Sequence, residues 1–484
     1  MPLILGTNSI KDPGGYNVAN SLRFNSGDSP SMSKASSDTG NAQFSIFSCW
    51  VKRGSLGSNQ TIFGHHIDAN NTTQFGFDSN DKLIFHVKEG GSNIVSLISN
   101  AVFRDTSAFY HLMLVQQQNA SAAADRIKIM ANGSRLTLAT STIPNELSSN
   151  HWVAGGDGTY SPRIGFNDGA DNNYFSGYLT EVVFLDGQTI PNSNDADYTA
   201  NANSTVEYDE DSGILKPKDP SGLTFGTNGF YFEFKQTGTS QNSSGLGADT
   251  SGNDSHFAVS NLTAVDQSTD TCTNNFCTLN PLDNFYAGST FSDGNLTLAT
   301  GADERTPNSS TMGVSTGKWY WEVKLGSNGA NAGYIGIQSG QTANDGVSAA
   351  RALGYNQYDY AFNADQQIYT NNSTTSYGGD WTDGDIISVA LDIDNSLLYF
   401  YINGSIQNSG TGVSIASPSL TRYGVYIPAV SDWKTQVLNF QFNFGSPPFA
   451  ISSSNADANG HGNFEYAVPS GYFALCTKNL AEHG

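Results

Sequence analysis

Aromatic residues gather in one stretch of the sequence, between Gly354 and Trp381. The group consists of Tyr355, Tyr358, Tyr360, Tyr369, Tyr377 and Trp381. Aromatic faces stack on sugar rings or pack against peptides, so the group predicts a recognition surface made of loops. Taken singly, each side chain is better explained by a place in a hydrophobic core, and we expect this for Tyr360 and Trp381.

Acidic residues on the predicted strands are too isolated for glycoside hydrolysis, which needs two carboxylates a short fixed distance apart. Glu181 and Glu322 each stand among alternating apolar residues, without a Glu-x-Asp-x-Glu arrangement. Single acids on strands usually face solvent, and we expect these two to do so. The sequence also lacks a Gly-x-Ser-x-Gly elbow, a P-loop and a dinucleotide fingerprint. We therefore predict no enzymatic activity.

Histidines and acidic loops are the places where a metal ion could bind. His65 and His66 are adjacent, and neighbouring residues of a strand point to opposite faces, so both cannot bind one ion without a bend. Acidic loops could offer oxygen ligands to calcium, and the candidates are Asp157, Asp168 and Asp171. Asp, Asn and Gly are also the usual residues of turns, which is the favoured interpretation. We expect no cofactor, with calcium the one ion left open.

Charge limits the partners of the chain. Its 22 Lys and Arg against 44 Asp and Glu give a formal net charge of −22. Nucleic acids and anionic membranes would be repelled, so we expect neither a nucleic-acid partner nor membrane insertion. The first residues are apolar but too few, and without basic residues, for a signal peptide. We expect synthesis in a cytoplasm without a secretory leader.

Cysteines are too few for a disulfide scaffold, at four in 484 residues. Cys272 and Cys277 have no second pair nearby, which argues against a zinc site. A local disulfide between them stays open, although two reduced thiols are favoured.

Short aromatic strands separated by Gly, Asn and Asp clusters predict an all-β protein. The clearest pattern lies between Gly317 and Gly404. Within it, Trp319 and Trp321 share one face of a strand with further apolar residues, and Tyr320, Glu322 and Lys324 lie on the other face. This alternation predicts a half-buried strand. A hairpin follows, and the next turn is Asn403-Gly404, a pair that accepts the positive φ angles of a type I′ turn.

These motifs resemble the SPRY (B30.2) β-sandwich. The matching segments are residues 317–323, 334–337, 384–387, 391–394 and 400–404. The resemblance implies a sandwich over residues 286–450 whose loops at one end bind ligands.

An earlier part of the chain resembles the concanavalin A-like, laminin G-type jelly roll. The matching segments are residues 22–25, 47–52, 127–133 and 175–182. The resemblance implies a second antiparallel sandwich, of a type that often carries calcium.

A third resemblance links the two sandwiches to a biological setting. Residues 229–234, 247–253 and 273–281 are similar to a recurring segment of tailed-bacteriophage virion proteins, especially those of aquatic phages. This similarity implies a non-enzymatic virion-surface protein, a tail fibre or adhesin that binds a host glycan or protein. A homo-oligomer, most naturally a trimer, is expected. The alternatives are a capsid or tail decoration or assembly protein without a ligand and, less favoured, a polysaccharide depolymerase.

The predicted organisation is two antiparallel β-sandwich domains joined by an extended connector. Its parts are an N-terminal arm (1–20) that anchors to other virion proteins, a jelly roll (21–235), the connector (236–285), a SPRY-like sandwich (286–450) and a C-terminal linker and tail (451–484).

Overall fold

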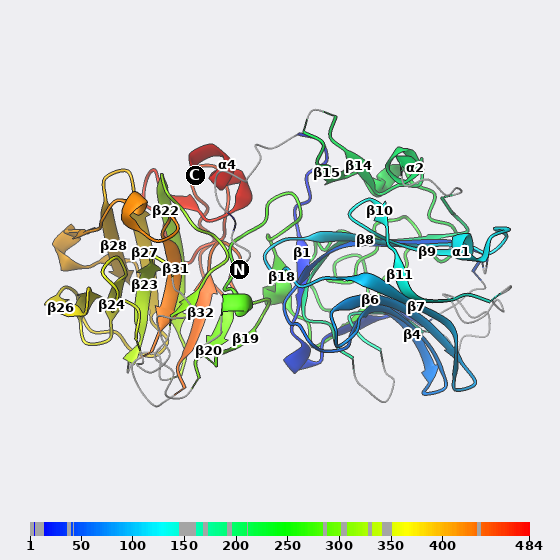
Figure 1. Ribbon diagram of the computed structural model, residues 1–484, viewed down its shortest axis with the longest axis horizontal. Coiled ribbons are helices and arrows are strands. Elements are labelled where there is room, and N and C mark those ends of the chain that lie inside the picture. The colour runs from blue at the N-terminus through cyan, green and yellow to red at the C-terminus, as the bar shows by residue number, and fades with distance from the viewer. Residues whose placement is uncertain are drawn as a thin grey trace. The chain divides into compact units, whose positions relative to one another are not determined.

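β-Strands dominate the computed structural model of the chain, which divides into two units (Figure 1). The first unit spans residues 13–273, and the second unit combines residues 1–12 with 274–484. The structure describes residues 4, 14–35, 40–41, 43–144, 161–167, 173–190, 196–210, 212–283, 288–301, 307–327, 332–340, 351–432 and 437–484. The predicted all-β class is confirmed.

The first unit is a sandwich of two antiparallel sheets. Across one sheet, the strands are β10 (Ser134–Arg135), β9 (Ile127–Ala131), β8 (Tyr110–Gln117), β3 (Phe44–Arg53), β13 (Gly177–Asp186), β1 (Ser21–Phe24) and β18 (Gln267–Ser268), and β16 (Phe230–Phe232) also pairs with β13. Across the other, they are β11 (Leu138–Thr142), β7 (Ser92–Val102), β6 (Lys82–Glu89), β5 (Asn71–Phe77), β4 (Gln60–Asp68), β12 (Ser161–Ile164), β2 (Ser31–Ser33) and β17 (Ala258–Ser260). The first unit also contains a hairpin of β14 (Val206–Tyr208) and β15 (Leu215–Pro217). Its two short helices are α1 (Ala123–Arg126) and α2 (Ala196–Ala200).

Apolar residues of both sheets form the core of the first unit. Phe47 of β3 stacks on Phe63 of β4, with the ring centroids 4.4 Å apart. The outer face of β13 is covered as well, because Val183 packs with Tyr198 and Phe225 from the segments that follow it. The central strands β3 and β13 are therefore buried on both faces.

The second unit is also built from two sheets. The β22 sheet contains, in order, β19 (Thr290–Ser292), β20 (Thr297–Ala299), β32 (Asn439–Asn443), β22 (Lys318–Leu325), β27 (Ile386–Asp392), β28 (Leu397–Ile402) and β29 (Ser405–Ile406), with β30 (Val413–Ser414) paired to β28 and β33 (Phe473–Ala474) paired to β22. The β23 sheet contains β21 (Asn308–Ser309), β31 (Ile427–Ser431), β23 (Tyr334–Gln338), β24 (Tyr360–Asn363), β25 (Gln367–Thr370) and β26 (Ser373–Ser376).

Alternation along β22 places Trp319 and Trp321 in the core of the second unit, as the sequence predicts. The turn after β28 has the expected geometry, since Asn403 and Gly404 have φ angles of 48° and 76°. Both angles lie in the left-handed region that a type I′ turn requires.

The described residues of the predicted connector, 236–283, form parts of both units rather than an extended connector. β17 pairs with β2 and β18 pairs with β1, which places both in the first unit. Beyond β18, Asp270 forms a buried ion pair with Lys52 of β3, with an N–O distance of 2.8 Å. Leu279 lies in the core of the second unit. Strands of two or three residues leave no periodic signal in a sequence, so this segment resembled a linker.

The C-terminal segment 451–484 covers the outer face of the β22 sheet. Phe464 packs edge-on against Tyr320 of β22, with the ring centroids 5.1 Å apart. β33 pairs in parallel with β22, and helix α4 (Thr477–His483) follows it. β22 is therefore buried on both faces and is not the half-buried strand that the sequence predicts.

Part of the predicted N-terminal arm is packed. Val18 is buried in the first unit, and its backbone N–H donates to the Thr273 hydroxyl at 3.1 Å. Ile4 forms a β-bridge with Met312 in the second unit. The remaining residues of 1–13 lie outside the described ones.

The four cysteines, Cys49, Cys272, Cys277 and Cys476, are free, so no disulfide joins Cys272 to Cys277. Among the described residues, no helix has the length and hydropathy to cross a membrane.

Candidate functional site

One end of the β23 sheet gathers loops that are far apart in the sequence. β23 ends at Gln338, which pairs with Ile427 at the start of β31. The preceding residue of β23 pairs with Tyr360, the first residue of β24. The segments beside these strand ends, residues 339–340, 356–359 and 416–426, therefore lie together, and we call their surface the loop end.

Hydrogen bonds hold these loops in place. The Tyr360 hydroxyl accepts from the backbone N–H of Ala416, and the Tyr426 hydroxyl donates to the carbonyl of Ala416, both at 3.0 Å. The Asp359 carboxylate accepts from the backbone N–H and the hydroxyl of Ser339, both at 2.8 Å. Loops fixed in this way lose less conformational entropy when they bind a partner.

Exposed apolar side chains and one arginine share the loop end. Leu420 is 58% exposed and Tyr423 is 45% exposed. The Arg422 guanidinium lies 5.8 Å from the centroid of the Tyr423 ring. Tyrosine and arginine are enriched in the residues that dominate binding energy at interfaces, so this surface is suited to contact a macromolecule.

The structure divides the six aromatic residues that were predicted to form a recognition surface. Tyr358 is half-buried in the loop end, and Tyr355 is half-buried against the outer face of the β23 sheet, where it packs beside Leu353. The other four, Tyr360, Tyr369, Tyr377 and Trp381, are buried. A six-residue surface is therefore wrong, because a side chain inside the protein cannot offer its face to a ligand. The core positions expected for Tyr360 and Trp381 are confirmed.

Contacts with other aromatic rings explain the burial of Tyr377, Trp381 and Tyr369. Tyr377 and Trp381 surround Phe362 of β24, with centroid distances of 5.6 Å and 4.9 Å. Burial raises the pKa of Tyr377 to about 12, so its hydroxyl stays protonated. Tyr369 packs edge-on against Tyr334 on the opposite face of the sheet, at 5.7 Å.

Leu420 and Tyr423 are absent from the sequence prediction, although a signal for them exists. They lie between Pro418 and Gly424, in a segment without the alternation of a strand. Apolar residues in such a turn-rich segment have no sheet face to bury them, so exposure is the simplest expectation.

Glu181 is buried, which corrects the prediction that it faces solvent. It lies in a β-bulge of β13 with a φ angle of 50°, a backbone conformation that is rare for residues other than glycine. The Tyr231 hydroxyl donates to its carboxylate at 2.7 Å, and the Tyr16 hydroxyl lies 2.7 Å from that of Tyr231. Burial raises the pKa of Glu181 to about 7.

Glu322 is also buried rather than solvent-facing. Its carboxylate accepts from the backbone N–H groups of Glu465 at 3.0 Å and Tyr466 at 2.8 Å. It also accepts from the Tyr320 hydroxyl and the Asn443 amide, each at 3.0 Å. Burial raises its pKa. Because Glu322 holds the C-terminal segment on β22 and Glu181 lies in the other unit, each carboxylate has a structural role of its own.

The weak calcium candidates Asp157, Asp168 and Asp171 lie outside the described residues. Within the ranges that the structure describes, no group of three His, Cys, Asp or Glu side chains is arranged to hold a metal ion.

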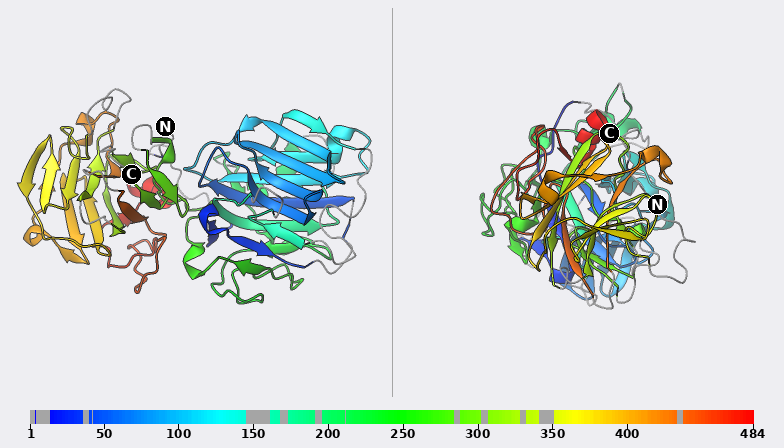
Figure 2. Two further views of the ribbon diagram at one scale, coloured as in Figure 1. Left: turned by 90° about the horizontal axis from the view of Figure 1, so that it is seen from below. Right: turned by 90° about the vertical axis from the view of Figure 1, so that its left-hand side faces the viewer.

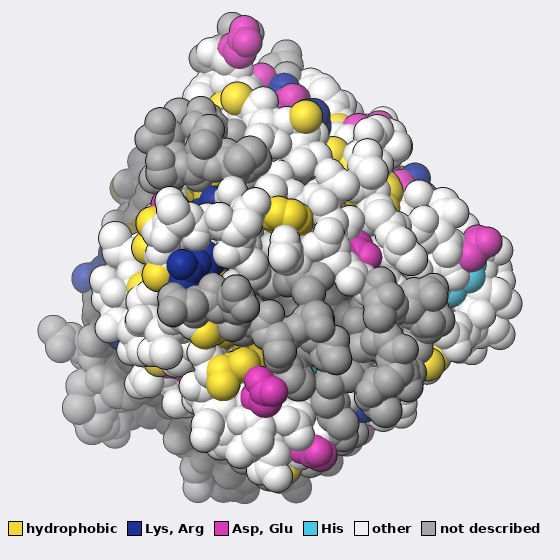
Figure 3. Space-filling view, turned by 90° about the vertical axis from the view of Figure 1, so that its right-hand side faces the viewer, with side chains coloured by type: hydrophobic (Ala, Val, Ile, Leu, Met, Phe, Trp, Pro, Cys, Tyr) yellow, Lys and Arg dark blue, Asp and Glu magenta, His cyan; other side chains and the backbone are white. Residues whose placement is uncertain are grey.

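Acidic side chains are spread singly over the face drawn in Figure 3, among uncharged polar groups. This arrangement agrees with a solvated acidic surface rather than one dedicated acidic site on that face.

Two family models match parts of the chain. A SPRY domain matches residues 318–447, and the concanavalin A-like lectin/glucanases superfamily matches residues 25–190. The chain is thus similar to a concanavalin A-like domain in its first half and to a SPRY domain in its second half.

Relatives of the chain are similar over limited stretches. The E3 ubiquitin-protein ligase RKP of Arabidopsis thaliana is 32% identical over 135 residues, which are 28% of this chain and 10% of that protein. The ATP-dependent RNA helicase DDX1 of Xenopus laevis is 28% identical over 171 residues, 35% of this chain and 21% of that protein. The chain therefore spans only a small part of each relative. The SPRY domain of human HERC1 has 17% identity and a TM-score of 0.25, over 34% of this chain and 96% of that structure.

Proposed function

We propose that this chain is a non-enzymatic adhesin on the surface of a tailed-phage particle and that its loop end contacts a glycan or protein of the host surface. The observation that carries the binding role is the exposure of Leu420 and Tyr423 beside Arg422. Apolar side chains fixed in this way are stabilised when a partner removes them from water.

The similarity of residues 229–281 to a segment of phage virion proteins supports the placement on a particle. A net charge of −22 keeps such a protein soluble and limits non-specific contact with nucleic acid. In this proposal the N-terminal residues attach the protein to other virion proteins, and the particle carries it as a homotrimer.

A role without catalysis is favoured by the environments of the strand acids. Glu181 and Glu322 lie in different units, and tyrosine hydroxyls donate to both carboxylates. A glycosidase pair would need two such groups facing one sugar bond.

Binding is tested with the purified full chain, applied to immobilised envelope glycans and envelope proteins of the host in separate arrays. Tyr423→Ala should weaken binding by about tenfold or more, as expected for a central aromatic contact. The matched control is Tyr208→Ala, which removes a tyrosine of equal exposure, 45%, from the first unit. Equal binding by the wild type and Tyr423→Ala would refute the role of the loop end.

The place of the protein is tested by antibody labelling and mass spectrometry of purified particles. Label that projects from the tail would support adhesion. Label spread flat over the capsid, without binding to either array, would replace the proposal with a decoration protein. Absence of the chain from particles would refute a virion role.

A further inference from the structure

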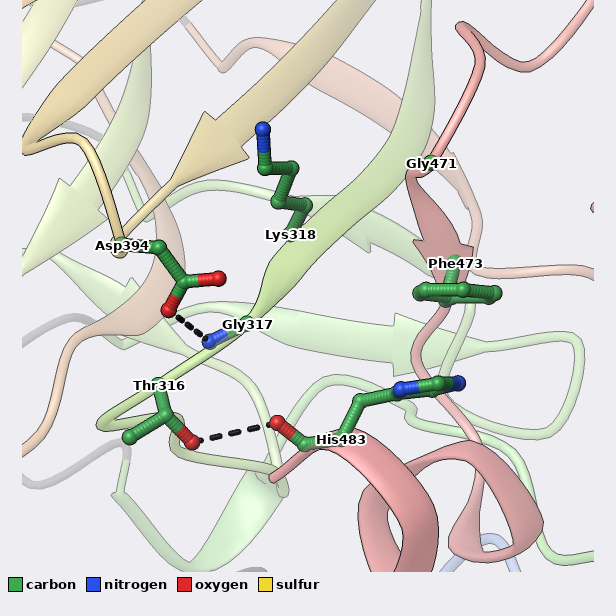
Figure 4. A pocket seen from close by; sticks show the side chains of 7 residues that line it. All are labelled: Thr316, Gly317, Lys318, Asp394, Gly471, Phe473 and His483. Carbon is green, nitrogen blue, oxygen red and sulfur yellow. Dashed lines mark hydrogen bonds between the residues drawn. The ribbon is translucent and has the colours of Figure 1, made fainter.

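A pocket of about 190 Å³ opens in the second unit where β22 begins. Its walls come from the start of β22, the turn between β27 and β28, β33 and helix α4 (Figure 4). In Figure 4, Asp394 and Lys318 stand on one side of the pocket and the rings of Phe473 and His483 on the other. These segments do not belong to the loop end, so the pocket is a second place where the protein could bind.

Contacts behind the pocket fix its polar groups. The backbone N–H of Gly317 donates to the Asp394 carboxylate at 2.8 Å. The Lys318 ammonium lies 2.9 Å from the Asp392 carboxylate, and this hydrogen bond raises the pKa of Lys318. Lys318 therefore stays charged at neutral pH. Side chains held by such contacts are preorganised for a ligand.

The aromatic wall is fixed as well. The His483 ring stacks on Phe473, with centroids 3.8 Å apart and planes 10° from parallel. The amide nitrogen of Asn459 lies 3.2 Å from Nε2 of His483.

The charged side chains at the pocket limit the kinds of ligand that it can bind. An anion would be repelled by Asp394, because Asp392 already balances the charge of Lys318. A cation would pair with Asp394 but has no lone pair to accept a hydrogen bond from Lys318. An apolar ligand would leave these groups without water or hydrogen bonds. A neutral molecule with several hydroxyl groups could donate to Asp394, accept from Lys318 and pack its C–H groups against Phe473.

The volume of the pocket limits the size of the ligand. Drug-sized sites enclose roughly 300–1,000 Å³, so this pocket suits a single ring rather than a chain of rings. We propose that the pocket binds one neutral sugar unit. The inference goes beyond the proposed function, which places contact at the loop end, and does not depend on it.

The test adds a panel of neutral monosaccharides, at millimolar concentrations because single rings bind weakly, to the full-length protein. NMR signals of the His483 ring, identified by their loss in His483→Ala, should shift with at least one sugar. Asp394→Ala should weaken that binding by about tenfold, because it removes a charged hydrogen-bond acceptor. The control Asp365→Ala removes an exposed carboxylate from another turn of the same unit and should change nothing.

The proposal is overturned if no sugar in the panel moves the His483 signals, or if Asp394→Ala binds as the wild type does. Methylammonium and acetate are added as charged probes, and a stronger response to either would replace the sugar with a charged ligand. Where Asp394→Ala fails to fold, the His483 shifts in the wild type still decide. Tyr423→Ala should retain sugar binding at the pocket even where it loses host-surface binding, so failure of the adhesin proposal is distinguishable from failure of this one.

Discussion

Replacing Glu181 with glutamine should remove a pH dependence from the stability of the first unit. Glutamine has nearly the same shape and can still accept the hydrogen bond that the Tyr231 hydroxyl donates at 2.7 Å. It cannot ionise. The variant therefore separates the charge of Glu181 from its packing.

The magnitude follows from the pKa of Glu181, which burial raises from 4.5 to about 7. The folded state holds the proton more tightly than the unfolded state, so this stabilising contribution is complete below pH 4.5 and is lost as the pH rises through 7. At about 1.4 kcal/mol per pKa unit, ionisation of Glu181 in the folded protein costs about 3 kcal/mol. Glu181→Gln should thus be more stable than the wild type by about 3 kcal/mol in mildly alkaline solution, and about equally stable in acid.

His111 acts in the opposite direction, since burial lowers its pKa from 6.5 to about 3. Its contribution to stability is lost as the pH falls below 6.5, because the unfolded state then binds a proton that the folded state excludes. The effect is common to both proteins and cancels in their difference.

Urea-dependent hydrogen exchange of β13 peptides measures the free energy of unfolding of the first unit separately from the second. The stabilities of wild type and Glu181→Gln should diverge as the pH rises from about 5 to about 7 and should then differ by a constant amount up to about pH 9. Glu207→Gln, a half-exposed acid of the same unit, should track the wild type. A constant difference between wild type and Glu181→Gln from about pH 5 to about pH 7 would refute the reasoning.

Two other changes test the buried polar contacts. Glu322→Ala leaves the backbone N–H groups of Glu465 and Tyr466 without their acceptor, so the second unit should lose about 3 kcal/mol or more and limited proteolysis should cut the C-terminal segment first. If proteases cut that segment no faster in Glu322→Ala than in the wild type, Glu322 does not anchor it. Lys52→Ala removes the ammonium partner of the buried Asp270 carboxylate and should cost about 3–5 kcal/mol in thermal unfolding, whereas the double change Lys52→Met and Asp270→Leu should cost less. A double variant as unstable as the single one would count against the ion-pair argument.

Local sequence pattern was sufficient to predict the strands and their inward faces. Trp319 and Trp321 alternate with polar residues, and Asn403-Gly404 specifies its own turn. Alternation compares the two faces of a strand, but it does not reveal what covers the more polar face. Glu322 is buried by residues more than a hundred positions away, and no local pattern contains that information.

Only part of the candidate site could be predicted from the sequence, because contacts between distant residues also decide which side chains are exposed. Tyr355 and Tyr358 were found because they lie in a loop rich in tyrosine. Tyr369 and Trp381 belong to the same cluster but are buried, because the fold turns them against other aromatic rings. Composition identifies such clusters, whereas tertiary packing decides which members reach the surface.

The C-terminal cover on β22 also sets an order of events during synthesis. The first unit has all its strands once residue 273 has left the ribosome. The second unit must wait, because Tyr320 and Glu322 gain their partners only after residues 464–466 have been made. A ribosome that stops before residue 451 would release a chain with one finished sandwich and one whose aromatic face is still open to chaperones and proteases.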